Sequence, residues 1–135
     1  MPLDFFLSKV ALAGLRRHAA RHASKGNGFG MRVIGWNGIS GTLTLGGMGR
    51  ERNLVVDREI YEAHQGEDGF DLRNDEAIRY LTPREFARLQ GFPDDFQITE
   101  RKTTAWRQFA DSVPIPMVEA VARRIRETIE SAGRW

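Results

Sequence analysis

The chain has 135 residues, of which 41% are hydrophobic, and a formal net charge of +2 at pH 7. A chain of this length forms one small domain and is short for a complete cofactor-dependent enzyme. It contains no cysteine, which excludes disulfides, a thiolate metal cluster and a cysteine nucleophile within these residues.

Arginine dominates the basic residues. Three of the 20 basic residues are lysine and the other 17 are arginine. The planar guanidinium makes paired hydrogen bonds to phosphate and to guanine edges, so this bias is compatible with a nucleic-acid partner. High genomic GC content produces the same bias. Composition by itself therefore only permits DNA binding.

Neither a membrane span nor a secretory signal is expected. No apolar run approaches the roughly 20 residues that a membrane span needs. The first residues also lack the basic and apolar regions of a signal peptide. We therefore expect a cytoplasmic protein.

The first predicted element is a helix over residues 4–24. Asp4 is its expected N-terminal cap, and Gly26 is expected to end it. Its second half is strongly basic and contains His18 and His22 one helical turn apart, the spacing of a metal-binding pair. No third ligand lies nearby in the sequence, and the glutamate of a His-Glu-x-x-His motif is missing. We interpret this half as a solvated basic face and predict no metal site.

The next stretch, residues 25–49, is rich in glycine and is incompatible with one long helix. Short runs of β-type residues lie between the expected turns, at 31–34, 42–45 and 53–56. These runs predict a small, irregular sheet.

Two glycine clusters, residues 26–30 and 46–49, invite comparison with phosphate-binding loops. Neither has the Gly-x-Gly-x-x-Gly pattern in a strand-turn-helix setting, and the Lys-Ser/Thr ending of a P-loop is absent, so we interpret them as turns. Directly after the second cluster, Arg50 and Arg52 lie on a loop. Phosphate contact and a surface ion pair with Glu51 both fit this loop.

Residues 59–74 are acidic and polar and predict an exposed loop, to which we assign no chemistry. The segment that follows specifies its own structure. Residues 82–85, Thr-Pro-Arg-Glu, form a capping box with proline at the first helical position. Gly91 stands where a left-handed C-terminal cap belongs, Phe92 can fold back on the helix, and Pro93 prevents continuation. We predict a short helix that ends in a rigid elbow.

The last predicted element is a helix over residues 106–132. Pro114 and Pro116 fall in its first turn, where amides have no intrahelical acceptor, and Asp111 or Ser112 is the expected cap. Apolar residues recur at helical spacing and form one stripe, which consists of Met117, Val118, Val121, Ala122, Ile125 and Ile129. The stripe packs either in the domain's own core or against another domain or chain.

Two segments resemble signature blocks of the bacterial DNA cytosine-5 methyltransferases. Residues 79–94, Arg-Tyr-Leu-Thr-Pro-Arg-Glu-Phe-Ala-Arg-Leu-Gln-Gly-Phe-Pro-Asp, resemble the ninth block. Residues 107–116, Arg-Gln-Phe-Ala-Asp-Ser-Val-Pro-Ile-Pro, resemble the tenth, in the family's order and spacing. Upstream, residues 25–30 and 42–54 resemble the target-recognition region. The resemblance therefore covers nearly the whole chain.

The resemblance implies an α+β fold. Its parts would be a small irregular antiparallel sheet, an N-terminal helix, a short capped helix, and a long C-terminal helix that docks on a Rossmann-like methyltransferase domain outside this chain. The implied segments are the N-terminal linking helix (1–26), the target-recognition region (27–77), the elbow of the ninth block (78–98), and the tenth block with its helix (103–135).

The tenth block departs from the family at one informative position. The family usually has Gly-Asn-Ser-Val, whereas this chain has Ala110-Asp111-Ser112-Val113. In the family this block begins a helix beside the S-adenosylmethionine pocket, and its serine contacts the amino-acid end of the cofactor. A helix N-terminus and a hydroxyl suit the carboxylate of the cofactor. Asp111 would repel that carboxylate but would attract the cofactor's ammonium group. The resemblance implies Ser112, with Asp111 and Val113, as cofactor-side residues.

The catalytic blocks of the family are missing. Its enzymes attack C6 of a flipped cytosine with the cysteine of a Pro-Cys block and then methylate C5. This chain lacks that cysteine and also the glycine-rich cofactor block, the Glu-Asn-Val block and the Gln-x-Arg block. We therefore expect no catalytic residue here and no activity from the chain alone. The expected arrangement is a split enzyme of restriction-modification, whose large subunit carries the nucleophile and most of the cofactor site.

The implied DNA-side residues fall into two sets. One set should approach duplex DNA and consists of Arg50, Arg52 and Asn53. The other should organise the recognition region against the catalytic domain or the DNA backbone and consists of Arg79, Thr82 and Arg84. Such a protein would be associated with the bacterial nucleoid. Two rival hypotheses stay open: a non-enzymatic DNA-binding fragment, and an interaction module without DNA affinity.

Overall fold

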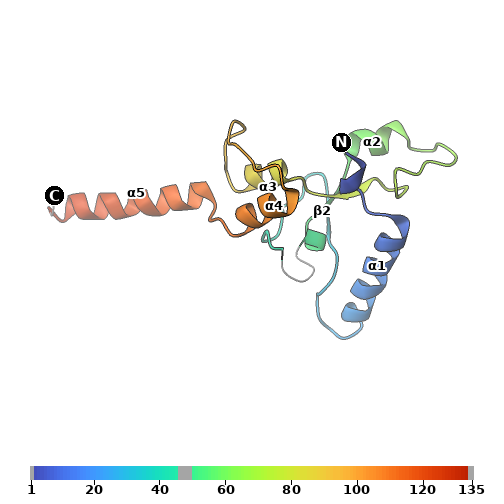
Figure 1. The fold of residues 1–135 in the computed structure, drawn as a ribbon. Helices are drawn as coiled ribbons and strands as arrows, with labels where there is room; N and C mark the ends of the chain where they lie inside the picture. The colour runs from blue at the N-terminus through green and yellow to red at the C-terminus, as the bar shows by residue number, and fades with distance from the viewer. Residues whose placement is uncertain (1, 46–49, 134–135) are drawn as a thin grey trace. The chain divides into compact units, whose positions relative to one another are not determined.

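The computed structural model describes residues 2–45 and 50–133, which form two compact units, Met1–Thr82 and Pro83–Trp135. The first unit holds the sheet with helices α1 and α2, and the second holds helices α3, α4 and α5 (Figure 1). The α+β class expected from the sequence is confirmed. Within the described residues, no helix is long and apolar enough to cross a membrane.

The sheet of the first unit has the strand order β1 (Val33–Ile34), β2 (Leu54–Val56), β3 (Ile78–Tyr80). β1 runs parallel to β2, whereas β3 runs antiparallel to β2, with Leu54 opposite Tyr80. The sheet is therefore mixed, and the prediction of an antiparallel sheet was wrong. A parallel pair requires a crossover, and the long connection at 35–53 provides one where a tight hairpin turn would have forced an antiparallel pair.

The expected strand at residues 42–45 is absent from the sheet, although Leu43 is buried. The Asn53 side chain, rather than a neighbouring strand, makes the hydrogen bonds that hold this segment. The Asn53 carboxamide oxygen accepts a hydrogen bond from the Gly41 amide at 2.8 Å, and its nitrogen donates to the Thr42 carbonyl at 3.1 Å. The backbone groups that a ladder would have paired are therefore paired with Asn53. The glycine cluster at 46–49 lies outside the described residues.

Helix α1 (Lys9–Ala23) begins later than the sequence suggested. Its cap is Ser8, whose hydroxyl accepts from the Ala11 amide at 3.2 Å, and the expected cap Asp4 lies in a short 3-10 helix, η1 (Leu3–Phe5). The helix cannot start earlier because residues 5–7 are buried, and the Leu7 amide donates to the Ile78 carbonyl at 3.2 Å. The other end is as predicted: Gly26 has φ +74° and completes the turn that ends the helix.

The core of the first unit forms where α1 packs on the sheet. Its fully buried members are Leu7, Leu12, Leu54 and Ile78. Partly buried apolar residues surround them, namely Leu15, Met31, Val33, Val56 and Tyr80. Burial of these side chains from four separate stretches of sequence fixes the strands relative to α1.

A short helix interrupts the segment that was expected to be a loop. Helix α2 (Arg58–Ala63) is capped by Asp57, whose carboxylate accepts from the Ile60 amide at 3.4 Å. The return to β3 depends on buried Asn74, whose amide nitrogen donates to the carbonyls of Leu7 and Ile78 at 2.8 and 2.9 Å. Its oxygen accepts from the Ile78 amide at 2.9 Å. Asn74 thus joins the chain before α1 to the start of β3.

In the second unit, α3 (Pro83–Leu89) has the predicted elbow. Gly91 has φ +82°, its amide donates to the Arg88 carbonyl at 2.9 Å, and the Phe92 amide donates to the Ala87 carbonyl at 2.9 Å. This pair of bonds is the Schellman arrangement that glycine favours at a helix end. A Cβ at Gly91 would lie 2.6 Å from Pro116 Cδ, so glycine is also required for close packing.

The predicted final helix is two helices, α4 (Lys102–Ala110) and α5 (Ile115–Ser131). The break falls at residues 111–114 because Pro114 has no amide hydrogen and cannot continue α4. Pro114 occupies the cap position of α5, with no side-chain capping bond, so the prediction of Asp111 or Ser112 as the cap was wrong. The Ile115 amide instead donates to the Gln90 carbonyl at 2.8 Å, which ties α5 to the end of α3.

Candidate functional site

Arg50 and Arg52 lie on a 3-10 helix, η2 (Arg50–Arg52), directly before β2. Their guanidinium groups point to different aromatic rings: Arg50 Cζ lies 5.0 Å from the ring centre of Tyr80, and Arg52 Cζ lies 5.7 Å from that of Phe29. Both distances are within the range of cation–π contacts. Each arginine therefore stacks on an aromatic ring, which restricts its side chain. Arg52 is exposed.

Tyr80 and Glu51 complete the surroundings of Arg50. The Tyr80 hydroxyl donates to the Glu51 carboxylate at 3.4 Å. Burial, together with the negative charge of Glu51, raises the pKa of Tyr80 above its ordinary value of 10.0. Tyr80 is therefore a neutral phenol at physiological pH and presents its ring to the cation above it.

Asn53 is placed inside the first unit. Its exposed fraction is 0%, and both ends of its carboxamide are bonded to residues 41 and 42. This position suits a residue that shapes the recognition segment. Its predicted approach to DNA would have to be indirect in this conformation.

Arg79 is also held inside the chain. Its Nε donates to the Asp57 carboxylate at 2.9 Å, and its Nη1 donates to the Tyr80 carbonyl at 3.1 Å. Only 9% of the Arg79 side chain and 13% of the Asp57 side chain are exposed. The pair joins β3 to the start of α2, which favours the organising role that we predicted over direct contact with DNA.

The ninth-block residues Thr82 and Arg84 flank the start of α3. Thr82 directly precedes the helix and is partly exposed. Arg84 donates from Nη1 to the Pro93 carbonyl at 3.2 Å and from Nη2 to the Phe96 carbonyl at 2.8 Å. Arg84 thus fastens the loop after the elbow to the helix.

A second arginine fastens the same loop. Arg88 makes a bidentate ion pair with Asp94, with Nε 2.7 Å from Oδ1 and Nη2 3.2 Å from Oδ2. The hydrogen bond from Arg88 lowers the pKa of Asp94 below its ordinary value of 3.8. The rings of Phe92, Phe96 and Phe109 pack together beneath this loop at centroid distances of 4.8 to 6.1 Å.

The cofactor-side residues lie in the connection between α4 and α5. The Ser112 hydroxyl donates to the Phe109 carbonyl at 2.8 Å, and the same carbonyl accepts from Gln90 Nε2 at 2.9 Å. Asp111 is exposed, and Val113 is 56% exposed. Gln90 is a buried residue that sequence reasoning missed, and only its position beside the capping glycine could have suggested it.

The groups at this connection suit the ammonium end of S-adenosylmethionine. With its hydrogen donated to Phe109, the Ser112 oxygen keeps lone pairs for an external donor, and the Asp111 carboxylate is accessible. The first amides of α5 are engaged: Ile115 donates to Gln90, and Met117 and Val118 donate to Pro114. The helix N-terminus is therefore not open to a carboxylate, contrary to the expectation from the sequence.

The apolar stripe of α5 is exposed. No residue of α5 is buried, and Met117, Val121 and Ile125 are 60%, 53% and 55% exposed. The remainder of the helix is covered with short-range ion pairs, such as Arg123 with Glu119 at 2.7 Å. Within the described residues of the second unit, the stripe is therefore not packed into a core.

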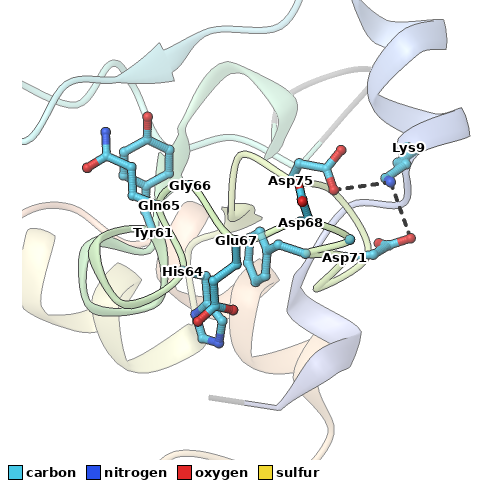
Figure 2. A pocket seen from close by; sticks show the side chains of 11 residues that line it. Lys9, Tyr61, His64, Gln65, Gly66, Glu67, Asp68, Asp71 and Asp75 are labelled. Carbon is cyan, nitrogen blue, oxygen red and sulfur yellow. Dashed lines mark ion pairs between the residues drawn. The ribbon is translucent and has the colours of Figure 1, made fainter.

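A hollow of about 530 Å³ lies elsewhere in the first unit, between the start of α1 and the loop after α2 (Figure 2). Lys9 Nζ is 3.1 Å from the Asp75 carboxylate and 3.4 Å from that of Asp71, and these bonds raise the pKa of Lys9. His64 stacks on Phe70 at 4.6 Å. Among the residues that the structure describes, no group of three His, Cys, Asp or Glu side chains is placed to hold a metal ion.

Comparison with known proteins gives consistent matches. The family model of the C-5 cytosine-specific DNA methylase matches residues 10–127. The chain is 43% identical over 129 residues to the type II methyltransferase M.HpaII of Haemophilus parainfluenzae, a match that covers 96% of this chain and 36% of that protein.

Two further relatives match along nearly the whole chain. Identity is 49% over 128 residues with the type II methyltransferase M.SsoII of Shigella sonnei, covering 94% of this chain and 30% of that protein. It is 35% over 137 residues with the DNA-cytosine methyltransferase of Escherichia coli K12, covering 95% and 29%. The chain thus spans about a third of the length of these relatives. No solved structure matches it.

Proposed function

The chain belongs to the C-5 cytosine-specific DNA methylase family, and on this basis we propose that it is the DNA-recognition part of a DNA (cytosine-5)-methyltransferase. In this proposal it also completes the S-adenosylmethionine site when it is joined to a catalytic part. The observation that carries the proposal is the family match over residues 10–127 in a sequence without cysteine. The nucleophile must then come from elsewhere.

The catalytic part supplies the chemistry. It carries the Pro-Cys nucleophile that attacks C6 of the flipped cytosine, and bound S-adenosylmethionine supplies the methyl group for C5. In the arrangement expected from the sequence, this part is a separate large subunit of a restriction-modification enzyme. The recognition part holds the duplex so that the target base can reach the nucleophile.

On the DNA side, Arg50 and Arg52 are the contact residues in this proposal. Each is braced by an aromatic ring, which limits the side-chain entropy lost on binding. Asn53 and Arg79 support them from inside, through residues 41–42 and Asp57 respectively. At the start of α3, Thr82 and Arg84 organise the recognition region against the catalytic part or the DNA backbone.

On the cofactor side, Ser112 and Asp111 receive the ammonium group of S-adenosylmethionine. Support comes from the accepting capacity of the Ser112 oxygen and from the exposed Asp111 carboxylate. Val113 adds apolar surface at the same place, with more than half of its side chain exposed. Gln90 positions this loop, because it shares the Phe109 carbonyl with Ser112.

The apolar stripe of α5 is the docking face for the catalytic part. An exposed apolar stripe along a whole helix is costly in water unless a partner covers it. Replacing Met117, Val121 and Ile125 with aspartate should abolish co-purification with the catalytic part. A matched control is the replacement of three charged residues on the same helix, Glu119, Arg123 and Glu127, with glutamine. Equal co-purification of both variants would contradict this docking face.

The deciding experiment is methyl transfer from labelled S-adenosylmethionine to duplex DNA. The chain alone is compared with the chain plus the protein encoded by the adjacent reading frame, which is the first candidate for the catalytic part. Transfer only in the mixture supports the proposal. Transfer by the chain alone would overturn it, because no cysteine is available. DNA binding without transfer in either sample would favour a non-enzymatic DNA-binding fragment.

A further inference from the structure

The lysines and arginines of α1 and of the turn that follows it divide into two groups with different surroundings. Lys9 and Arg16, seven residues apart and so on one side of the helix, are both paired with carboxylates. Lys9 pairs with Asp71 and Asp75, and Arg16 Nη2 lies 2.6 Å from the Glu76 carboxylate. The positive charge on this side is neutralised by the segment that precedes β3.

Arg17, Arg21 and Lys25 form the second group, here named the cationic stripe. They recur every four residues in the sequence and are all exposed; Arg17 and Arg21 lie on α1, and Lys25 lies in the turn after its last residue, Ala23. Within residues 2–45 and 50–133, none of the three forms an ion pair with a carboxylate. Helix α1 itself contains no aspartate or glutamate. The like charges of the stripe therefore repel one another without internal compensation.

The recognition loop reaches the same surface. Gly30, where a Cβ would lie 2.6 Å from Ala19 Cβ, allows the chain after α1 to fold back closely along the helix (Figure 1). This close approach places the ring of Phe29 5.9 Å from that of His22, and Arg52 Cζ lies 5.7 Å from the centre of the same Phe29 ring. Phe29 thus connects Arg52 on η2 to the basic half of α1.

The histidines of α1 are held beside the stripe by local contacts. The rings of His18 and His22 are 4.4 Å apart, and His22 Nδ1 lies 2.8 Å from the Asn27 carboxamide oxygen. Burial, with smaller contributions from His22 and Arg21, lowers the pKa of His18 below 6.5. His18 is therefore neutral at pH 7, and the charge of this surface comes from the stripe and Arg52.

We propose that the cationic stripe, together with Arg52, binds the phosphate backbone of duplex DNA. The inference rests on the proposed function and extends the DNA-contacting surface to a helix that the sequence alone suggested was merely solvated. The helix dipole favours cations in the last turn of α1, but it accounts neither for Arg17 nor for Arg52 on η2. Arg17 and Arg21 are about 6 Å apart along the axis of α1, so they would meet different phosphates of a strand that presents one charge roughly every 3.4 Å.

The test measures binding of the full chain to a fluorescent 24-base-pair duplex between 50 and 200 mM salt. The triple variant Arg17→Gln, Arg21→Gln, Lys25→Gln removes the stripe while keeping residues of good helix propensity. The single variants Arg21→Gln and Arg16→Gln are a matched pair, because each removes one charge from α1 but Arg16 is already neutralised by Glu76. Circular dichroism of each variant verifies that α1 is retained.

The expected result is a shallower dependence of affinity on salt. Loss of three phosphate contacts reduces the slope of log affinity against log salt by about 2.7. The ratio of the DNA affinity of the unmodified chain to that of the triple variant should therefore fall roughly 40-fold between 50 and 200 mM salt. Arg21→Gln should reduce the slope by about 0.9 and Arg16→Gln should leave it unchanged. The weakening should be equal for GC-rich and AT-rich duplexes, because phosphate contacts carry no sequence information.

Three outcomes would overturn the inference. These are no binding by the unmodified chain at 50 mM salt, an unchanged slope in the triple variant, and equal effects of Arg16→Gln and Arg21→Gln. An unchanged slope combined with lost assembly with the catalytic part would assign the stripe to a protein partner. The proposed function is judged separately, by methyl transfer in the mixture, so either idea can fail while the other is upheld.

Discussion

The buried pair of Arg79 and Asp57 gives the sharpest test of how the recognition unit is held together. In Asp57→Asn the charge is lost, while the side-chain oxygen that caps α2 is kept, since asparagine caps as well as aspartate. Removing one member of a buried ion pair costs about 3–5 kcal/mol, because the remaining charge is left without compensation. With 9% and 13% of the two side chains exposed, we expect a loss near the lower end, about 3 kcal/mol.

Two further variants separate the charge pair from the cap. Asp57→Ala also removes the cap and should cost about 1 kcal/mol more. Replacing both residues, as Asp57→Asn with Arg79→Met, leaves no buried charge and should recover most of the loss, because apolar replacements of buried pairs are often neutral. Urea unfolding of the full chain gives these values, and hydrogen exchange at the Ile78 amide reports on its bond to Asn74 at the start of β3.

The same variants decide between two roles of Arg79. If Arg79 organises the unit, Asp57→Asn destabilises the sheet and weakens DNA binding or leaves it unchanged. If Arg79 instead contacts DNA and Asp57 only holds its side chain in the free protein, Asp57→Asn should destabilise the fold by less than about 1 kcal/mol, as loss of an exposed ion pair does. It should then also strengthen DNA binding. That second pattern would refute the argument from burial.

Three further predictions concern the elbow, the recognition segment and pH. Gly91→Ala should lower the stability of the fold by about 2–4 kcal/mol, because the new Cβ is strained at a left-handed backbone position and overlaps Pro116. Gly14→Ala, at an open position within α1, is the control and should be neutral or stabilising; thermal melts of both variants check this. Asn53→Ala should cost about 1–3 kcal/mol in urea unfolding because two backbone groups lose their partners, and undiminished stability with lost DNA affinity would instead make Asn53 a contact residue. Because the pKa of Asp94 is lowered in the folded state, its stabilising contribution is present above about pH 4 and is lost as pH falls through the folded-state pKa. In Arg88→Gln, carboxyl NMR should show the Asp94 pKa rising toward 3.8. An unchanged pKa would rule out Arg88 as the cause.

Local sequence rules succeeded where one short segment contains all the interacting groups. The elbow after α3 needs only a glycine, the amides beside it and the carbonyls one turn earlier, so its prediction was correct in detail. The end of α1 at Gly26 is of the same kind. The start of α1 was wrong because both Asp4 and Ser8 can cap a helix, and burial of residues 5–7 against β3 decides between them.

The direction of β1 and the roles of the polar residues depend on contacts between distant segments. Asn53 stands in a run of charged residues and looked like a surface residue, yet it replaces a strand partner for residues 41–42. Arg79 gave no hint of its partner, because Asp57 lies 22 positions away. The apolar stripe of α5 was predicted from its spacing, but its exposure within the second unit could be learned only from the structure.

The arginines of this chain become informative once their partners are known. Arg79, Arg84 and Arg88 are bonded to groups of their own unit and fix backbone segments in place. A phosphate that approached Arg88 would also meet the Asp94 carboxylate, so the local field offers it little attraction. Around Arg17, Arg21 and Arg52 the described residues provide no such carboxylate partner, and the field there is uncompensated. Composition treats all of these side chains alike, whereas their pairing separates those that build the recognition part from those available to a nucleic acid.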